Sequence, residues 1–311
     1  MKTKHQGWGW MLAVDFFFAG MGGGMLVIAG IIELFIGGGN TSLLGNILGP
    51  LFMCAGCGFL ILELGRPLQA WRVFMNPKAI LTIGAWLMSI AIVSGLVYAS
   101  FGLTSETIFW KDWTFFRKLF ALVDIVTGLV VAAYPGVLLG RHKGRPFWVG
   151  PGIMALFLLS SLVTGAAAHL FSGILVSAPN SQEVMNALPG LIEAMLFLQL
   201  LLWCGYIWIK LTGTTEVEAA SAKRWFKGDL SDNFKFQFLL AGTLLPLIMI
   251  LLPTTLTQAI GSLLVLLGGV TMRMLVVRSG EDRTWLPGEQ KYRSRLPMGH
   301  EEFMKKLWDN K

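Results

Sequence analysis

The chain has 311 residues, of which 54% are hydrophobic and only 14% are charged, and its mean hydropathy is +0.64. Soluble domains carry about 25% charged residues, so this composition excludes an ordinary soluble globular protein. The net charge of +7 reflects an uneven placement of basic residues between the apolar segments and does not indicate nucleic-acid binding. The sequence therefore predicts an all-α integral membrane protein.

The apolar residues occur in blocks of about 18–28 residues, each long enough to cross a hydrocarbon core about 30 Å thick as a helix. No block alternates between apolar and polar residues, which excludes membrane strands. Breaks rich in Gly, Pro and Asn separate the blocks. Eight transmembrane helices are expected in one domain, residues 1–278, at approximately Trp8–Ile36, Ile47–Leu64, Ile80–Ser100, Phe115–Leu139, Val149–Phe171, Ala187–Leu211, Phe234–Leu252 and Leu256–Val277.

The loop charges predict the orientation of these helices. Nearly all of the 25 Lys and Arg residues fall on the side that holds both termini, and only Lys111, Arg117 and Lys118 fall on the other side. The positive-inside rule therefore places both termini in the cytoplasm of a multi-pass plasma-membrane protein. No cleavable signal peptide is expected, because the first apolar run is too long for one. Residues 279–311 are expected to form an amphipathic cytoplasmic tail that either lies on the membrane or docks on a partner.

Cysteine and histidine usage limits the redox centres that this protein can hold. Cys54, Cys57 and Cys204 lie in apolar blocks. The CxxC of Cys54 and Cys57 is interpreted as packing, because redox-active dithiols need an electropositive, accessible setting. Three thiols cannot hold an iron–sulfur cluster, which takes four ligands. Of the four histidines, only His169 lies well inside a span, so no bis-histidine haem is expected. No metal site is predicted. Redox work would require a diffusible membrane cofactor and an electron path in a partner protein.

Ionisable residues inside a membrane are expensive, and they are functional candidates for that reason. Asp15 lies about 10 Å and Tyr134 about 8 Å from the side of the termini, at a rise of about 1.5 Å per helical residue. Glu63, Arg66 and Trp10 lie near that surface, so all five side chains can converge on one pocket. Trp10 could equally be an interfacial anchor, and Arg66 could snorkel or pair with Glu63.

A second polar layer lies near the other membrane surface. It consists of Glu33, Asp124, His169 and Glu193, from four different spans. Two such layers suit a protein that binds a headgroup on one side and moves protons across the membrane. Hydrogen bonding between helices would explain the same residues, and both interpretations stay open.

Three segments resemble a known family. WGWMLAVDFFFAGMGGG at residues 8–24, LELGRPLQAWRVFMNPKAILTIGAW at residues 62–86 and YPGVLLG at residues 134–140 are similar to the NrfD-type membrane subunits, the family of the polysulfide reductase membrane anchor. The resemblance implies a haem-free anchor of eight helices, arranged as two four-helix bundles, that binds menaquinone or ubiquinone. It also implies a ferredoxin-like partner with four iron–sulfur clusters and a molybdopterin catalytic subunit.

In that family the quinone pocket uses polar residues of span one and a tyrosine of span four, which correspond to Asp15 and Tyr134 here. This sequence lacks the histidine that polysulfide reductase has early in span one. The expected function is therefore electron exchange between the membrane quinol pool and an iron–sulfur subunit, in anaerobic respiration. Arg66, Arg72 and Lys78 are expected on the docking face. The best-known relatives carry their catalytic subunits outside the cytoplasm, on the side of the termini, whereas the charges here favour the cytoplasm.

A transporter or ion channel that uses the buried acids as a relay is the alternative function. The two halves of the sequence show no inverted repeat of broken helices, which such transporters often have.

Overall fold

The computed structural model describes residues 9–37, 41–63, 67–76, 78–103, 109–110, 112–142, 144–150, 152–177, 181–213 and 216–281. The regular structure in these ranges is entirely helical. Seven helices are long and apolar enough to cross a membrane. They are α1 (Trp10–Phe35), α2 (Leu43–Glu63), α3 (Ile80–Ser100), α4 (Thr114–Gly140), α5 (Gly152–Leu175), α6 (Gln182–Leu211) and α9 (Thr255–Ser279). The expected amphipathic tail lies outside the described residues from position 282 onwards.

The seventh expected span, Phe234–Leu252, corresponds to a shorter apolar helix, Asn233–Met249. Its first part, η2 (Asn233–Leu244), is a π-helix and its last part, α8 (Leu245–Met249), is an α-helix that starts near Pro246. Gly242 of η2 packs directly on Gly268 of α9. A π-helix is wider than an α-helix and rises less per residue. The number of apolar residues in the sequence therefore does not give the length of this helix.

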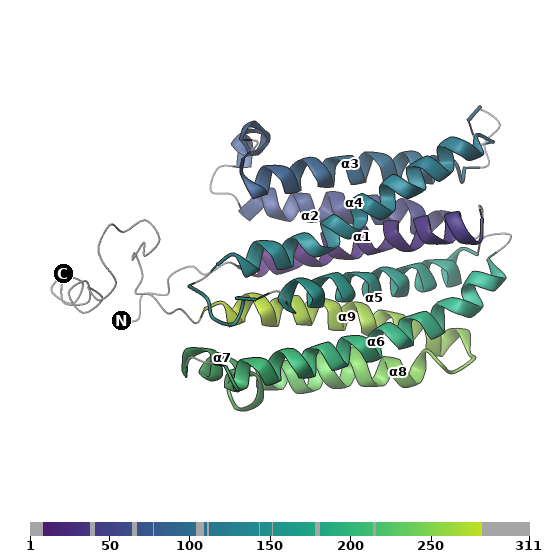
Figure 1. Ribbon diagram of the computed structural model, residues 1–311. Helices are drawn as coiled ribbons and strands as arrows, with labels where there is room; N and C mark the ends of the chain where they lie inside the picture. Colours follow the sequence, from purple (N-terminus) through teal and green to yellow (C-terminus); the bar gives the residue numbers. More distant parts are fainter. Residues whose placement is uncertain are drawn as a thin grey trace.

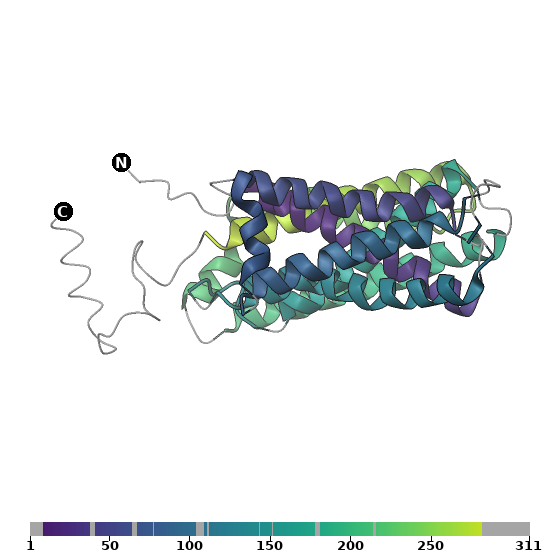
Figure 2. The same ribbon diagram turned by 90° about the horizontal axis from the view of Figure 1, so that it is seen from above.

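The long helices run along a common axis, as Figure 2 shows. Figure 1 shows α1 to α4 along one side of the bundle and α5, α6, α8 and α9 along the other. We call the end of the bundle that holds Gly9, α7 and Ser279 the terminal face, and the end that holds α8 the opposite face. Helix α1 packs against both sides, because it contacts α2 and α4 as well as α5 and α9.

The glycine run of α1 explains how one helix touches so many neighbours. Successive residues of a helix point about 100° apart, so consecutive glycines face different directions. A β-carbon at any of three of them would come closer than 3.0 Å to the backbone of a neighbour. Gly22 lies against Gly49 of α2, Gly23 against Gly128 of α4 and Gly24 against Ser161 of α5. The glycines of α1 thus serve three different helices.

Two further helices lie at the terminal face and do not cross the bundle. η1 (Pro67–Met75) is a 3₁₀ helix with no fully buried side chain, and α7 (Glu216–Lys227) follows α6. Trp225 of α7 is buried, and its Nε1 donates a hydrogen bond of 2.8 Å to Ser279 Oγ at the end of α9. This contact attaches α7 to the bundle.

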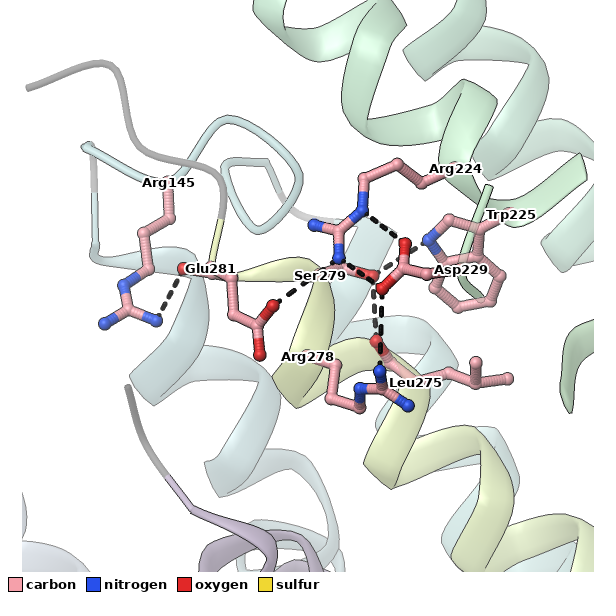
Figure 3. Close-up of polar contacts among 9 residues, drawn as sticks. Arg145, Arg224, Trp225, Asp229, Leu275, Arg278, Ser279 and Glu281 are labelled. Atoms are coloured by element: carbon pink, nitrogen blue, oxygen red, sulfur yellow. Dashed lines mark hydrogen bonds and ion pairs between the residues drawn. The ribbon is translucent and has the colours of Figure 1, made fainter. Parts of the chain in front are cut away.

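A charged cluster surrounds the same contact (Figure 3). Arg224 bonds both carboxyl oxygens of Asp229, at 2.9 and 2.8 Å, and Arg278 reaches Asp229 at 3.5 Å. Arg145 donates to the Gly280 carbonyl at 2.7 Å. The hydrogen bonds from Arg224 hold the pKa of Asp229 below its ordinary value. The cluster ties the loop after α4, the end of α7 and the end of α9 together.

Candidate functional site

A cavity of about 240 Å³ lies between α1, α2, η1, α3 and α4, towards the terminal face. Its wall is mostly apolar and includes the aromatic rings of Phe16, Trp71 and Phe74. Asp15 of α1 and Tyr134 of α4 line it, together with Cys57 of α2. Apolar walls with a few polar groups are typical of sites for small organic ligands.

Asp15 of α1 is 5% exposed, and its Oδ1 has no hydrogen-bond partner among the described residues. The carboxyl lies against α2, where a β-carbon at Gly56 would come within 3.2 Å of Oδ1. Only glycine therefore leaves full room for the carboxyl at this crossing. A buried polar atom without a partner is costly, so a ligand or water in the cavity has an open acceptor to bind.

Tyr134 of α4 is half-buried, and its hydroxyl also lacks a partner in the described part of the chain. Its ring packs on Gly84 of α3, where a β-carbon would come within 2.6 Å of the ring carbon Cζ. Helix α3 therefore fixes the ring, while the phenol remains available as a donor. Asp15 and Tyr134 are close enough to interact electrostatically.

The other residues expected in the pocket lie around it. Glu63 is at the end of α2, where Oε1 accepts a 3.0 Å hydrogen bond from the Gly9 amide. Its Oε2 is buried without a partner among the described residues, and it interacts electrostatically with Asp15. Trp10 is 59% exposed and packs edge-on against Phe59, away from the cavity wall. Arg66 lies outside the described residues.

The second polar layer separates into distinct groups. Glu33 is buried at the opposite face, where Arg117 binds both of its oxygens at 2.8 and 2.9 Å and Tyr98 donates at 3.2 Å. Asp124 is fully buried and accepts a hydrogen bond from Ser94 on α3. Both groups lie on the side of α1 that faces α3 and α4.

His169 and Glu193 are not linked to those groups by any hydrogen bond among the described residues. His169 Nε2 lies 2.9 Å from the Met25 carbonyl, and its Nδ1 faces Gly45 of α2. Glu193 is half-buried on α6, in the other half of the bundle. The structure thus brings Asp15 and Tyr134 to one cavity, and it places the four residues of the second layer in four separate environments.

The sequence indicated no functional role for two notable residues. Arg273 of α9 is fully buried and donates to the Phe16 carbonyl at 3.0 Å and to the hydroxyls of Ser160 and Ser161 at 3.1 and 3.0 Å. It therefore joins α9 to α1 and α5. Cys57 lines the cavity beside Asp15, whereas the sequence suggested only a packing role. Its place depends on how α1 and α2 are rotated against each other, which the sequence does not show.

The chain matches the family described as "Polysulphide reductase, NrfD" over residues 2–282. It is 26% identical over 299 residues to the C subunit of polysulfide reductase from Wolinella succinogenes, an alignment that covers 88% of this protein and 94% of that one. It is also 24% identical over 187 residues to protein NrfD of Escherichia coli K12, which covers 53% of this protein and 59% of that one. Together with the apolar helices, the family match shows a multi-pass membrane protein. The chain belongs to the polysulphide reductase NrfD family.

Proposed function

We propose that this chain is the quinone-reactive membrane subunit of a respiratory oxidoreductase complex. The observation that carries the proposal is the apolar cavity into which Asp15 and Tyr134 bring a carboxyl and a phenol without other partners among the described residues. The name of the Wolinella relative, a lettered subunit of polysulfide reductase, supports a place in a multi-subunit reductase. The chain would act as its quinol dehydrogenase or quinone reductase subunit, and it would not be catalytic alone.

The residues present fit a quinone. A quinone has a flat apolar ring with an oxygen at each end, and the cavity offers apolar walls with one polar group on α1 and another on α4. When bound, a menaquinone or ubiquinone would supply two-electron, two-proton redox chemistry. Asp15 and Tyr134 would hold the two oxygens, and the aromatic side chains of η1 would cover the ring.

The carboxyl groups of Asp15 and Glu63 would accept and release the protons of the reaction. Asp15 would accept a hydroxyl proton during quinol oxidation, and Tyr134 would donate a hydrogen bond to the other oxygen. Glu63 interacts with Asp15 and has a free Oε2 among the described residues, so it would pass protons to the terminal face. In the reverse direction the same groups would deliver protons.

Transfer of protons to the opposite face is a further part of this proposal. Asp124 and then Glu33 would form the route, because both lie between α1, α3 and α4, as the cavity does. Asp124 is ten residues from Tyr134 along α4, about 15 Å at the helical rise, so water would have to complete the route. His169 and Glu193 would belong to it only through water, since no hydrogen bond among the described residues links them to it.

The partners would dock at the terminal face. Arg72 on η1 and Lys78 just after it are exposed there, and Arg66, outside the described residues, would extend the same basic surface. A ferredoxin-like subunit with four iron–sulfur clusters would receive electrons at this surface, and a molybdopterin subunit would complete the complex. We place this face in the cytoplasm from the loop charges. Asn233–Met249 would be the eighth crossing, so that each half contributes a four-helix bundle.

Gentle purification from the native membrane tests the proposal. We expect iron–sulfur and molybdopterin subunits to co-purify, with about one extractable quinone per chain. A Y134F variant should retain the partners and lose bound quinone, because the phenol is the donor that the cavity supplies. A lone polypeptide without bound quinone would contradict the proposal and direct attention to ion-flux assays in liposomes.

A further inference from the structure

Cys57 is the cysteine that lines the cavity among the described residues. It lies on α2 and is partly buried against the packed side chains of α1, α3 and α4. Cys54 lies one turn earlier on the same helix and is exposed, outside the cavity wall. Cys204 is exposed on α6, in the other half of the bundle. The three free thiols therefore differ in their surroundings.

A base lies beside the Cys57 thiol. Asp15 is buried, lines the same cavity, and places Oδ1 against Gly56, the residue that precedes Cys57. The two side chains are close enough to interact electrostatically. Because Oδ1 has no other partner among the described residues, it is free to take a proton from a neighbouring thiol. An adjacent general base activates a nucleophilic thiol even where burial disfavours a standing thiolate.

We propose that Cys57 is a covalent modification site for 1,4-quinones that have an unsubstituted ring carbon, with Asp15 as the base that activates it. The inference rests on the proposed function in one respect, that the cavity accepts a quinone ring. Such compounds are electrophiles, and binding beside the thiol would raise its effective concentration. Fully substituted quinones would occupy the same cavity without reacting.

The reaction needs no further oxidant or reductant. Cys57 Sγ forms a bond to the unsubstituted ring carbon, while the S–H bond and one ring double bond break. Asp15 takes the thiol proton and delivers it to one ring oxygen, and the hydrogen on the attacked carbon moves to the other oxygen. The step is redox-neutral overall. The two carbonyl carbons gain two electrons and become those of a hydroquinone, and the attacked ring carbon loses two as its C–H bond is replaced by the C–S bond. The sulfur stays at the same oxidation level in the thioether as in the thiol.

Two probes separate reaction from simple binding. The reactive probe is 2-methyl-1,4-naphthoquinone, which has one free ring carbon, and the matched unreactive probe is 2,3-dimethyl-1,4-naphthoquinone, which has none. The full-length protein in its native membrane is treated with the first probe for increasing times. Peptide mass spectrometry then measures the fraction of each cysteine that carries the probe. A modified peptide gains the mass of one probe molecule, to within the mass of two hydrogen atoms.

We expect Cys57 to be modified at least about tenfold faster than Cys54, because general-base assistance contributes about 10²-fold or more. Excess 2,3-dimethyl probe should slow the labelling of Cys57 and leave Cys54 unchanged. D15N should slow the labelling of Cys57 about tenfold or more, C57A should abolish it, and C54A should leave it unaltered. The wild-type labelling is read directly, so it does not depend on the folding of any variant.

Labelling of Cys57 no faster than that of Cys54 would overturn the inference, as would equal labelling in the D15N variant. Quinol turnover measured on the same membranes separates this inference from the proposed function. Turnover without a Cys57 adduct would refute only the modification site. A Cys57 adduct without quinol turnover or bound native quinone would refute the respiratory role and retain the reactive thiol.

Discussion

The Oδ1 atom of Asp15 on α1 lies so close to Gly56 on α2 that a β-carbon at that glycine would approach it to 3.2 Å. The same β-carbon would lie 3.1 Å from the Ala19 amide nitrogen. Two residues further along α2, Gly58 has no neighbour within 4 Å. The two glycines thus offer a direct comparison between a residue that shapes the cavity and one that faces outwards.

Substitution of Gly56 by alanine should impair function more than folding. The added methyl group would displace the Asp15 carboxyl by a few tenths of an ångström, and overpacking of this kind costs about 1–3 kcal/mol. We expect quinol turnover to fall at least about tenfold, because small displacements of a reacting group are expensive. The matched variant G58A should keep full turnover and gain about 0.5–1 kcal/mol of stability. Equal turnover in both variants would mean that the contact between Asp15 and Gly56 is unimportant.

The ion pair between Glu33 and Arg117 should show strong coupling. Arg117 replaced by Met leaves the 4% exposed Glu33 side chain without its cation, and an unpaired buried charge costs about 3–5 kcal/mol. The double variant E33Q/R117M removes both charges and should recover most of that loss. Thermal unfolding in detergent measures the effect, with K118A as the control for an exposed neighbouring cation. Additive losses in the double variant would show that the pair is not coupled.

The crossing of α1 and α5 should tolerate no side chain. A β-carbon at Gly24 would overlap the Ser161 carbonyl, and one at Gly165 would overlap the backbone of Gly24. Because backbone cannot move as a side chain does, G24A and G165A should each cost about 3 kcal/mol or more and lower the yield of folded protein. G190A, at a glycine with nothing within 4 Å, is the control. Normal yield and melting temperature for G24A would refute the close crossing.

Asp229 should contribute a small, acid-sensitive stabilisation of the terminal face. Its pKa lies below the ordinary value of 3.8 because Arg224 hydrogen-bonds the charged form. The contribution is therefore full above about pH 4 and is lost as the pH falls through the lowered pKa. Its size should not exceed about 1 kcal/mol, since the side chain is 49% exposed. Melting curves of wild type and D229N should differ by a constant amount from pH 7 to pH 5 and converge in stronger acid. A difference that grows in acid would contradict this.

The sequence predicted the long helices well, because hydropathy and polar breaks are local signals. The third expected span, Ile80–Ser100, coincides with α3. The sequence did not predict η1 or α7, since both are short and amphipathic and lie at the terminal face. The sequence did not predict the π-helix η2 either, because the close contact between Gly242 and Gly268 is a tertiary feature.

Part of the candidate site was visible in the sequence. Depth along each helix indicated that Asp15 and Tyr134 occupy one level, and both line the cavity. Depth does not define the direction in which a side chain points, so Trp10 was expected in the pocket although it faces outwards. The same limit concealed Cys57, whose place beside Asp15 depends on how α1 and α2 are rotated against each other.

The most direct test of the central claim is quinol oxidation by the intact complex in native membranes, comparing D15N with wild type. The asparagine keeps the size of the side chain and removes the proton acceptor, so we expect turnover to fall about 10²-fold or more while the partners remain bound. E183Q, at an exposed acid of α6 outside the cavity wall, should retain wild-type turnover. Wild-type turnover in D15N would show that Asp15 is not the proton acceptor and would contradict the account.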